Sequence, residues 1–314
     1  MKKRIFTIIL AALLVLSASA CNKASDDHIS EDGRSPANSY AEAESELADD
    51  EGDQIKSDGT IICNGNDNTR MVYKINQNGE LKLYIKDWNE KRVVSSLPFS
   101  DEAEIEKFLY KEKAIAVNSK LACLFMRDSN GITVIRLEKG SQNETVTHLD
   151  VSEEDTEISG NFVNENVGFV FTFKEVSDSH ASGGWKVSSL FVTKDGGNTW
   201  RVIGVQSAVS ISLREHVIFS AMASEKVGLI SGNYFGADYN FCERTILTTD
   251  GGLNWVKVAG LPEINELQWA IATDFKQTDD AYILTVRYTV SEENGELGYA
   301  EYKLTDLNTW TRIK

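Results

Sequence analysis

The chain has 314 residues, a formal net charge of −16 and four cysteines. This acidic balance argues against nucleic acid and anionic lipid as partners of the folded part, because both need Lys and Arg to neutralise phosphates. No two cysteines have the spacing of metal ligands, so a zinc cluster is not expected.

Residues 1–20 have the three parts of a secretory signal. Met1–Arg4 is positively charged, an apolar run extends from Ile5 to Leu16, and small residues then lead to Cys21. Twelve residues of helix span about 18 Å, whereas the hydrocarbon core of a bilayer is ~30 Å thick. We therefore expect a signal peptide and not a membrane-spanning helix.

Cys21 directly follows Ala18-Ser19-Ala20, and this arrangement resembles the lipobox of bacterial lipoproteins. The resemblance implies cleavage before Cys21, attachment of lipid to that cysteine, and anchoring at the extracytoplasmic face of the cell membrane. Ala18 occupies the position at which the family usually has leucine. An ordinary cleavage site that happens to precede a cysteine is the alternative.

The segment after Cys21 is strongly acidic, since residues 22–58 contain twelve Asp and Glu but only three Lys and Arg. Such a stretch cannot bury enough apolar surface to offset the entropy of ordering it, and its charges extend it. We expect residues 21–58 to form a disordered tether that spaces a folded domain, residues 59–314, from a membrane. A disordered tail without a spacing role is the alternative.

Two segments of the folded domain repeat each other, Val192–Trp200 and Leu247–Trp255. Each has an Asp-Gly-Gly turn between alternating strands, which predicts a β-hairpin because glycine adopts positive φ without strain. Trp200, Trp255 and Trp310 follow one another at intervals of 55 residues. Hairpins repeated in this way need neighbours to cover their faces, so we expect a ring or a stack.

These hairpins resemble the Asp-box, S/T-x-D-x-G-x-T-W, of sialidases, sortilin-type receptors and photosystem II assembly factors. The copies consist of Thr193, Asp195, Gly197, Thr199 and Trp200; of Thr248, Asp250, Gly252, Asn254 and Trp255; and, in degenerate form, of Asp306 and Trp310. The resemblance implies an all-β fold, a β-propeller of four-stranded blades in which successive sheets shield one another around a closed ring. It also implies that the Asp-boxes are structural turns between third and fourth strands, on the face away from any active site.

We expect about five blades, and six is the alternative because the first two units are poorly marked. The five units are 59–99, 114–150, 155–207, 216–260 and 269–314. Between the first two units, residues 101–113 carry Ile105, Phe108 and Leu109 among charged residues, which predicts a short amphipathic helix.

The loops between second and third strands would lie on the opposite face, at Lys174–Gly184, Tyr234–Glu243 and Thr289–Gly298. The middle loop carries Tyr234, Phe235 and Tyr239, and Trp185 flanks the same side. Aromatic residues in loops are typical of binding surfaces, and equally of loops that pack on their own blade. These four aromatic residues are the candidate binding residues.

Catalytic signatures are weak. None of the three prolines follows Arg-Ile, as a sialidase would require, and Tyr288 beside Arg287, near Glu292 and Glu293, is the one cluster of that kind. The sequence has no G-x-S-x-G elbow, no phosphate-binding loop and no histidines at metal-ligand spacing, so we expect no cofactor and no metal.

The sequence therefore predicts a membrane-anchored extracytoplasmic lipoprotein whose non-catalytic β-propeller binds a protein or a glycan. An extracellular glycoside hydrolase, sialidase-like or with two carboxylates, is the alternative. Cys63 and Cys123 are predicted to be buried apolar residues of strands, with a disulfide between them as the alternative, and the state of Cys242 is left open.

Overall fold

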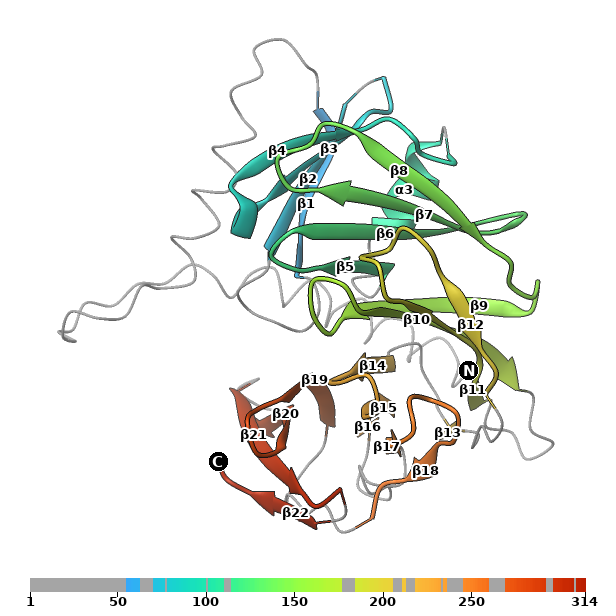
Figure 1. The fold of residues 1–314 in the computed structure, drawn as a ribbon. Helices are drawn as coiled ribbons and strands as arrows, with labels where there is room; N and C mark the ends of the chain where they lie inside the picture. Colours follow the sequence, from blue (N-terminus) through green and yellow to red (C-terminus); the bar gives the residue numbers. More distant parts are fainter. Residues whose placement is uncertain are drawn as a thin grey trace, which may run out of the picture. The chain divides into compact units, whose positions relative to one another are not determined.

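In the computed structural model, the described residues form antiparallel sheets and one α-helix (Figure 1). Residues Ala43–Lys314 form one compact unit. The described residues are 55–62, 70–76, 78–99, 101–109, 114–176, 184–205, 211–212, 218–232, 234–235, 245–259, 269–291, 296–307 and 309–314. The signal peptide, the lipid-bearing Cys21 and the tether up to Gln54, all expected from the sequence, lie outside them. Within the described ranges, no helix has the length and apolar character needed to cross a membrane.

The described strands form five sheets, each with four strands that follow one another in the chain and pair side by side. The first sheet consists of β1 (Ile55–Ile62), β2 (Arg70–Asn76), β3 (Leu81–Ile85) and β4 (Glu90–Val94). The second consists of β5 (Ile115–Val117), β6 (Leu121–Asp128), β7 (Gly131–Glu138) and β8 (Glu144–Leu149). The third consists of β9 (Asp155–Phe162), β10 (Gly168–Val176), β11 (Gly184–Thr193) and β12 (Arg201–Ile203).

The last two sheets continue this order. The fourth consists of β14 (Ile218–Met222), β15 (Gly228–Gly232), β17 (Thr245–Thr248) and β18 (Val256–Lys257). The fifth consists of β19 (Trp269–Gln277), β20 (Tyr282–Ser291), β21 (Glu296–Thr305) and β22 (Thr309–Arg312). Two short strands, β13 (Ile211–Ser212) and β16 (Tyr234–Phe235), pair with β11 and β19 respectively. The prediction of five four-stranded units is confirmed.

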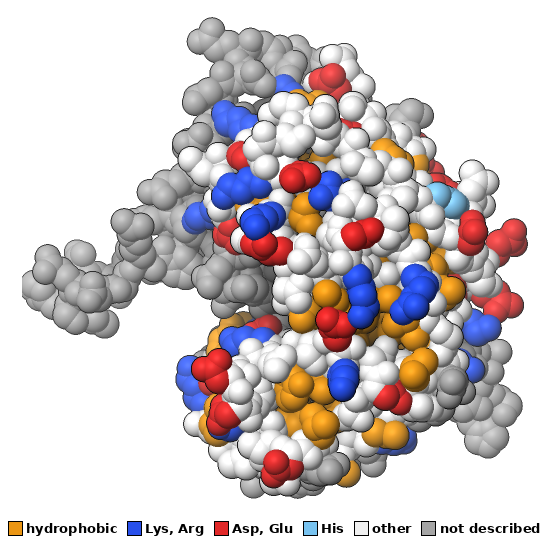
Figure 2. Space-filling view, in the orientation of Figure 1, with side chains coloured by type: hydrophobic (Ala, Val, Ile, Leu, Met, Phe, Trp, Pro, Cys, Tyr) orange, Lys and Arg blue, Asp and Glu red, His pale blue; other side chains and the backbone are white. Residues whose placement is uncertain are grey.

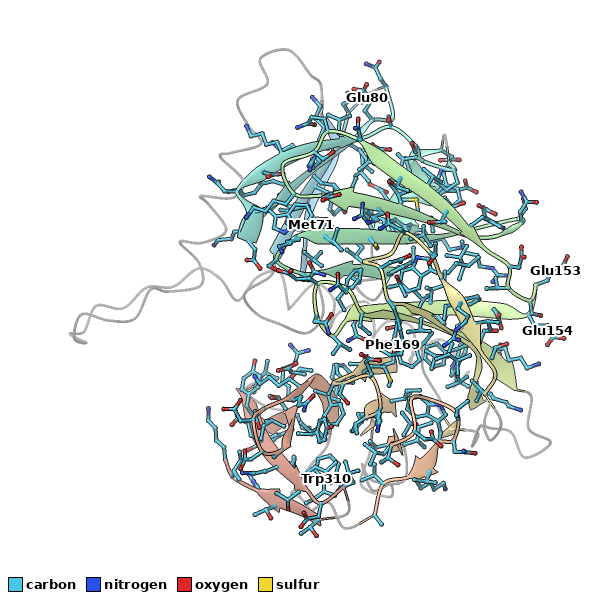
Figure 3. The ribbon with its side chains drawn as sticks, viewed as in Figure 1. Met71, Glu80, Glu153, Glu154, Phe169 and Trp310 are labelled. Carbon is cyan, nitrogen blue, oxygen red and sulfur yellow. The ribbon has the colours of Figure 1, made fainter. Side chains whose placement is uncertain are left out.

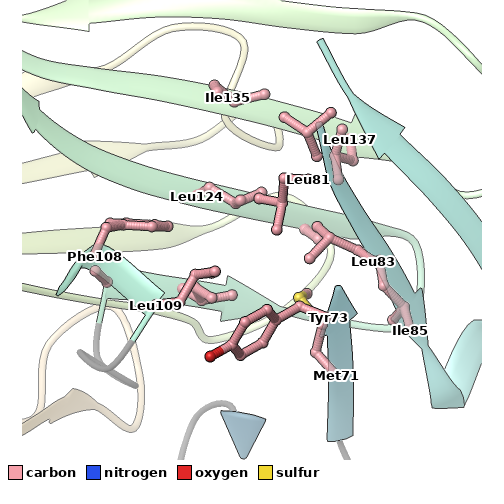
Figure 4. Packing of buried hydrophobic residues seen from close by; sticks show 14 of the residues in the cluster. Met71, Tyr73, Leu81, Leu83, Ile85, Phe108, Leu109, Leu124, Ile135 and Leu137 are labelled. Carbon is pink, nitrogen blue, oxygen red and sulfur yellow. The ribbon is translucent and has the colours of Figure 1, made fainter. Parts of the chain in front are cut away.

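The strands form because apolar residues alternate along them and bury one face of each sheet. In the first sheet, Met71 and Tyr73 of β2 and Leu83 of β3 point toward the second sheet, where Leu124 and Ile135 meet them (Figure 4). The single described α-helix, α3 (Glu102–Leu109), covers an edge of the same cluster. It buries the apolar residues at i, i+3 and i+4 that predicted it, Ile105, Phe108 and Leu109.

Four apolar clusters join the sheets in chain order. They lie between the first and second, the second and third, the third and fourth, and the fourth and fifth sheets. The first strands β5, β9, β14 and β19 also contact one another in succession. Successive four-stranded sheets with neighbouring first strands are the arrangement of β-propeller blades. Closure of a ring between the first and fifth sheets stays a prediction.

The boundary between tether and domain needs a correction. The predicted tether extends to residue 58, but β1 begins at Ile55 and pairs through Ser57 and Asp58 with β2. Ser57 and Asp58 are polar and have a low intrinsic preference for strand. Their backbone pairing with β2 outweighs that low preference.

Candidate functional site

The first Asp-box hairpin is closed by its own side chains. Asp195 accepts hydrogen bonds from the hydroxyl groups of Thr193 at 2.8 Å and Thr199 at 2.6 Å, and from the Thr199 N–H at 2.9 Å. Gly197 N–H donates to the Thr193 hydroxyl at 2.8 Å. Trp200 Nε1 donates to the Gly197 carbonyl at 3.2 Å, which folds the indole back over the turn. The hairpin joins β11 and β12, the third and fourth strands of their sheet.

The second hairpin, between β17 and β18, repeats this network. Asp250 accepts from the hydroxyl of Thr248 at 2.9 Å and from the side-chain amide of Asn254 at 2.8 Å. Gly252 N–H donates to the Thr248 hydroxyl at 2.9 Å, and Trp255 Nε1 donates to the Gly252 carbonyl at 3.0 Å. Both copies therefore have the same bonds at the same positions.

The degenerate third copy forms its turn with a different backbone conformation. Asp306 and Leu307 both have positive φ, 54° and 58°, and they lie in the connection between the register partners Thr305 and Thr309. Trp310 of β22 is buried in the cluster between the fourth and fifth sheets. Asp306 therefore contributes here through its backbone conformation.

Each Asp-box tryptophan contacts the sheet that precedes its own. The ring of Trp200 meets Phe125 of β6 edge to face, with centroids 5.8 Å apart. Trp255 meets Phe171 of β10 in the same way at 6.0 Å. The hairpins thus fasten the third sheet to the second and the fourth to the third, which is a structural task.

The charge on the two turn aspartates is stabilised by these bonds. Burial alone would raise the pKa of Asp195, but hydrogen bonds from Thr199 and Thr193 outweigh it and lower the pKa. The pKa of Asp250 is lowered for the same reason, with Asn254 as the main donor. Both carboxylates are therefore ionised acceptors held in a turn.

The same end of the sheets also carries the turns between first and second strands, and we call this end the Asp-box face. Ion pairs join neighbouring sheets across it. Lys120 Nζ lies 2.5 Å from a carboxylate oxygen of Glu165, and Lys194 Nζ lies 2.7 Å from one of Glu225. Much of the polar character of this face is therefore used to hold sheet to sheet.

The loop face, the opposite end, carries the turns between second and third strands and the links from one sheet to the next. The best-defined link joins β8 to β9. Arg127 Nη2 donates to the carbonyls of Ser152 and Glu153, both at 3.1 Å. The fully buried Asp155 accepts from the Thr172 hydroxyl at 3.1 Å. These bonds fix the link, and Figure 3 shows Glu153 projecting outward from it.

An ion pair extends this cluster toward solvent. Lys174 Nζ lies 2.8 Å from a carboxylate oxygen of Glu154. The hydrogen bond from Lys174 lowers the pKa of Glu154, and the bond to Glu154 raises the pKa of Lys174. The sequence does not predict the ion pair between Lys174 and Glu154, because the two residues are far apart in the chain and belong to no recognisable motif.

The aromatic residues predicted to bind a ligand are only partly accounted for. Tyr234 and Phe235 form β16, which pairs with Ala270 and Trp269 of the next sheet. Their side chains, and all of Tyr239, lie outside the described residues. Trp185 is a correction: it is 6% exposed within the cluster between the third and fourth sheets. Alternation along β11 turns its ring into the core, where burial of a large apolar face is favourable.

Two residues that the sequence analysis did not single out are exposed on the loop face of the fifth sheet. Leu297 is 48% exposed and Tyr299 is 50% exposed, and both lie near the start of β21. Because they are two residues apart in a strand, their side chains share one face of the sheet. Alternation along β21 predicts that Leu297 and Tyr299 lie on the exposed face, since Ala300, Tyr302 and Leu304 occupy the buried face.

The two described residues of the sialidase-like cluster do not face one site. Arg287 and Tyr288 are adjacent in β20, so they point to opposite faces of the sheet. Tyr288 packs against the cluster between the fourth and fifth sheets, and its ring lies over Gly298. Glu292 and Glu293 lie outside the described residues.

Cys123 is a free, buried thiol, and burial raises its pKa to about 12 against the opposing charge of Arg136. It is therefore the buried apolar residue that the sequence predicts and not half of a disulfide; Cys63 and Cys242 lie outside the described residues. Within the described part of the chain, no group of His, Cys, Asp and Glu could hold a metal ion.

No protein-family model and no curated protein matches the sequence. Among solved structures, the BP39L lectin from Burkholderia pseudomallei aligns at a TM-score of 0.39 and 13% identity, covering 82% of this chain and 70% of the lectin. An exo-1,5-alpha-L-arabinanase from a bovine ruminal metagenomic library gives 0.32 and 10%, covering 79% of this chain and 94% of that one. TolB from Acinetobacter baumannii gives 0.32 and 10%, covering 82% of this chain but only 57% of TolB. At these scores the likenesses carry no inference about a ligand.

Proposed function

We propose that the chain is a lipid-anchored extracytoplasmic binding protein whose β-propeller recognises a protein or a glycan through its loop face. The signal-like residues 1–20 and Cys21 support export and lipid attachment, and the acidic segment after Cys21 supports a spacing tether. The anchor brings the protein to a membrane, and the propeller provides the surface for recognition.

The observation that carries the proposal is the contrast between the two faces. On the Asp-box face, the carboxylates of Asp195 and Asp250 accept hydrogen bonds within their own turns, and ion pairs link the sheets. On the loop face, Leu297 and Tyr299 expose apolar surface beside one another. Exposed aromatic rings supply contact area for protein side chains and for the apolar faces of sugars.

Hydrolysis is the alternative function that the sequence leaves open. A glycosidase needs a general acid whose pKa is raised. Wherever a described carboxyl group has a pKa displaced from its ordinary value, the displacement is downward.

The test uses the full chain in detergent on a glycan array, on a set of candidate protein ligands, and with chromogenic glycosides. We expect binding without turnover, and Tyr299→Ala should weaken it about tenfold, as loss of an exposed aromatic anchor does. Val202→Ala is the matched control, because Val202 is 58% exposed on the outer strand β12. Turnover of any glycoside, or equal loss of binding in both variants, would contradict the proposal.

A further inference from the structure

The outer edge of β21 is covered by β22 along only part of its length. β21 pairs with β22 from Tyr302 to Thr305, and Glu301 adds hydrogen bonds to the residues that follow β22. Residues 296–300 pair with β20 on one side and with no described strand on the other. In the first sheet, by contrast, the third strand β3 is paired with β4 along its whole length. The fifth sheet therefore presents an open strand edge at its loop-face end.

The hydrogen bonds of Glu301 show which backbone groups point toward this edge. Glu301 N–H donates to the carbonyl of Lys314 at 3.3 Å, and the Glu301 carbonyl accepts from Ile313 N–H at 2.8 Å. In an antiparallel sheet, the N–H and C=O of one residue point to the same side, and successive residues alternate. The register of β21 with β20 is regular from Leu297 to Glu301. Tyr299 and Leu297 therefore point their N–H and C=O groups away from β20, and these four groups have no partner among the described residues.

The side chains at this edge are apolar and exposed. Leu297 is 48% exposed and Tyr299 is 50% exposed. Natural proteins protect open strand edges with charged residues, with proline or with a covering segment. The sequence from Leu297 to Ala300 contains no charged residue and no proline. Unpaired backbone groups next to exposed apolar side chains make this edge suited to accept another strand.

We propose that the open edge of β21 binds an extended segment of a protein partner as an additional strand. The backbone of the segment pairs with the N–H and C=O groups of Leu297 and Tyr299, and its alternate apolar side chains pack against the side chains of these two residues. Five residues of strand span about 17 Å, so a segment of about five residues fills the edge from Glu296 to Ala300. The inference rests on the proposed function and deepens it, because it names an extended peptide as the class of ligand.

Charge favours a basic segment. Residues 288–302 contain four glutamates and no lysine or arginine, and β20 adds one cation, Arg287, opposite Tyr299. On the face of the molecule drawn in Figure 2, acidic and basic side chains are interspersed, so a run of this kind in the sequence is a local excess of acid. Positive charge on the partner speeds association and selects among apolar segments. A second copy of this chain is a poorer occupant, because copies with a net charge of −16 repel each other.

The first test measures the binding of synthetic peptides to the full chain in detergent by fluorescence anisotropy. The probes are nine-residue peptides with lysine at both ends, in which Val, Ile, Leu or Phe alternates with Ser or Thr. We expect members of this set to bind, and replacement of their terminal lysines by glutamate should weaken binding at least about tenfold. Absence of binding by every peptide of the set would overturn the inference.

N-methylation of a bound peptide distinguishes strand addition from contact through side chains alone. Methyl groups on the N–H groups that face β21 remove hydrogen bonds, whereas methyl groups on the intervening N–H groups face solvent. We expect two N-methyl groups in one alternating set to weaken binding at least about tenfold, and two in the other set to change it less than about twofold. Equal effects of the two sets would overturn the inference.

Amide hydrogen exchange, resolved by residue with NMR, tests the edge itself. In the free chain, the N–H groups of Leu297 and Tyr299 should exchange at least about a hundredfold faster than those of Gly298 and Ala300, which point toward β20. The bound peptide should slow exchange at Leu297 and Tyr299 and leave the other two unchanged. Slow exchange at all four positions in the free chain would overturn the inference, because the edge would already be covered by this chain or by a second copy.

Variants separate this inference from the proposed function. Leu297→Ala and Tyr299→Ala should each weaken peptide binding about tenfold, whereas the control Val202→Ala on β12 should leave it unchanged. If no peptide binds but a glycan or a folded protein binds in a manner that depends on Tyr299, the inference fails and the proposed function stands. Turnover of a glycoside contradicts the proposed function and leaves the result with the peptides unaffected.

Discussion

The side-chain amide of Asn254 donates a 2.8 Å hydrogen bond to Oδ2 of Asp250. Thr199 makes the corresponding bond to Oδ2 of Asp195 with its hydroxyl, at 2.6 Å. The backbone N–H groups of Asn254 and Thr199 both donate at 2.9 Å to the other carboxylate oxygen. The amide therefore replaces the threonine hydroxyl without loss of a bond, which explains how the second hairpin departs from the motif and keeps its geometry.

This equivalence predicts the effect of two substitutions. Asn254→Thr should leave the melting temperature nearly unchanged, because a hydroxyl can make the same bond to Asp250. Asn254→Ala removes it and should cost about 1 kcal/mol, which corresponds to a few degrees. Thermal unfolding followed by circular dichroism tests both. Equal destabilisation by Thr and Ala would show that the bond does not stabilise the hairpin.

Gly252 should tolerate no side chain. Its φ is +91°, and a Cβ there would overlap the Leu190 side chain of the preceding sheet. Gly252→Ala should therefore cost more than about 2 kcal/mol, from backbone strain and from displacement of Leu190.

Gly140 is the matched control for this substitution. Its φ is +77°, but a Cβ there would have no atom within 4 Å. Gly140→Ala should cost only the strain of the left-handed backbone, about 1 kcal/mol. Urea unfolding of both variants separates the two contributions, and equal costs would mean that Leu190 adapts freely.

The spacing of the tryptophans predicted the architecture well, because it reflects a repeated physical unit. The first and second sheets carry no clear copy of the motif, yet their strands at 55–94 and 115–149 largely coincide with the expected units 59–99 and 114–150. Each hairpin buries its tryptophan against a neighbouring sheet, so the tryptophan is present even in the degenerate copy that ends at Trp310.

The candidate site was much harder to predict. Trp185 was a candidate binding residue, with packing on its own blade as the alternative, and its place in β11 turns it into the core. Arg127 and Asp155, which fix the link on the loop face, are far from each other in the chain and belong to no pattern. Which face of a strand meets a neighbouring sheet is decided by tertiary packing, and a single sequence does not encode that choice locally.

Cys123 should not react with thiol-modifying reagents in the folded protein. Burial raises its pKa to about 12, so the reactive thiolate is almost absent at pH 8. We expect alkylation of Cys123 by iodoacetamide to begin only as urea unfolds the chain, at the same midpoint as the circular dichroism signal. Peptide mass spectrometry distinguishes it from the other three cysteines. Modification in the absence of urea would contradict the buried position.

Acid should weaken the Asp-box hairpins in a predictable direction. The folded-state pKa values of Asp195 and Asp250 are lowered, whereas an unfolded aspartate titrates near 3.9. The unfolded chain therefore takes up these protons first as the pH falls. The stabilising contribution of each aspartate is fully present above about pH 5, and it is lost as the pH falls below 4 through the folded-state pKa.

Asp250→Asn isolates this contribution from that of the other carboxylates, because the amide does not titrate. At pH 7 the variant should have a lower free energy of unfolding than the unmodified chain. Between pH 5 and pH 3 the gap between the two proteins should narrow, because only the unmodified chain loses the charge on Asp250. Urea titrations at several pH values measure the gap. A gap that stays constant down to pH 3 would mean that the hydrogen bonds from Asn254 and Thr248 do not favour the ionised carboxylate.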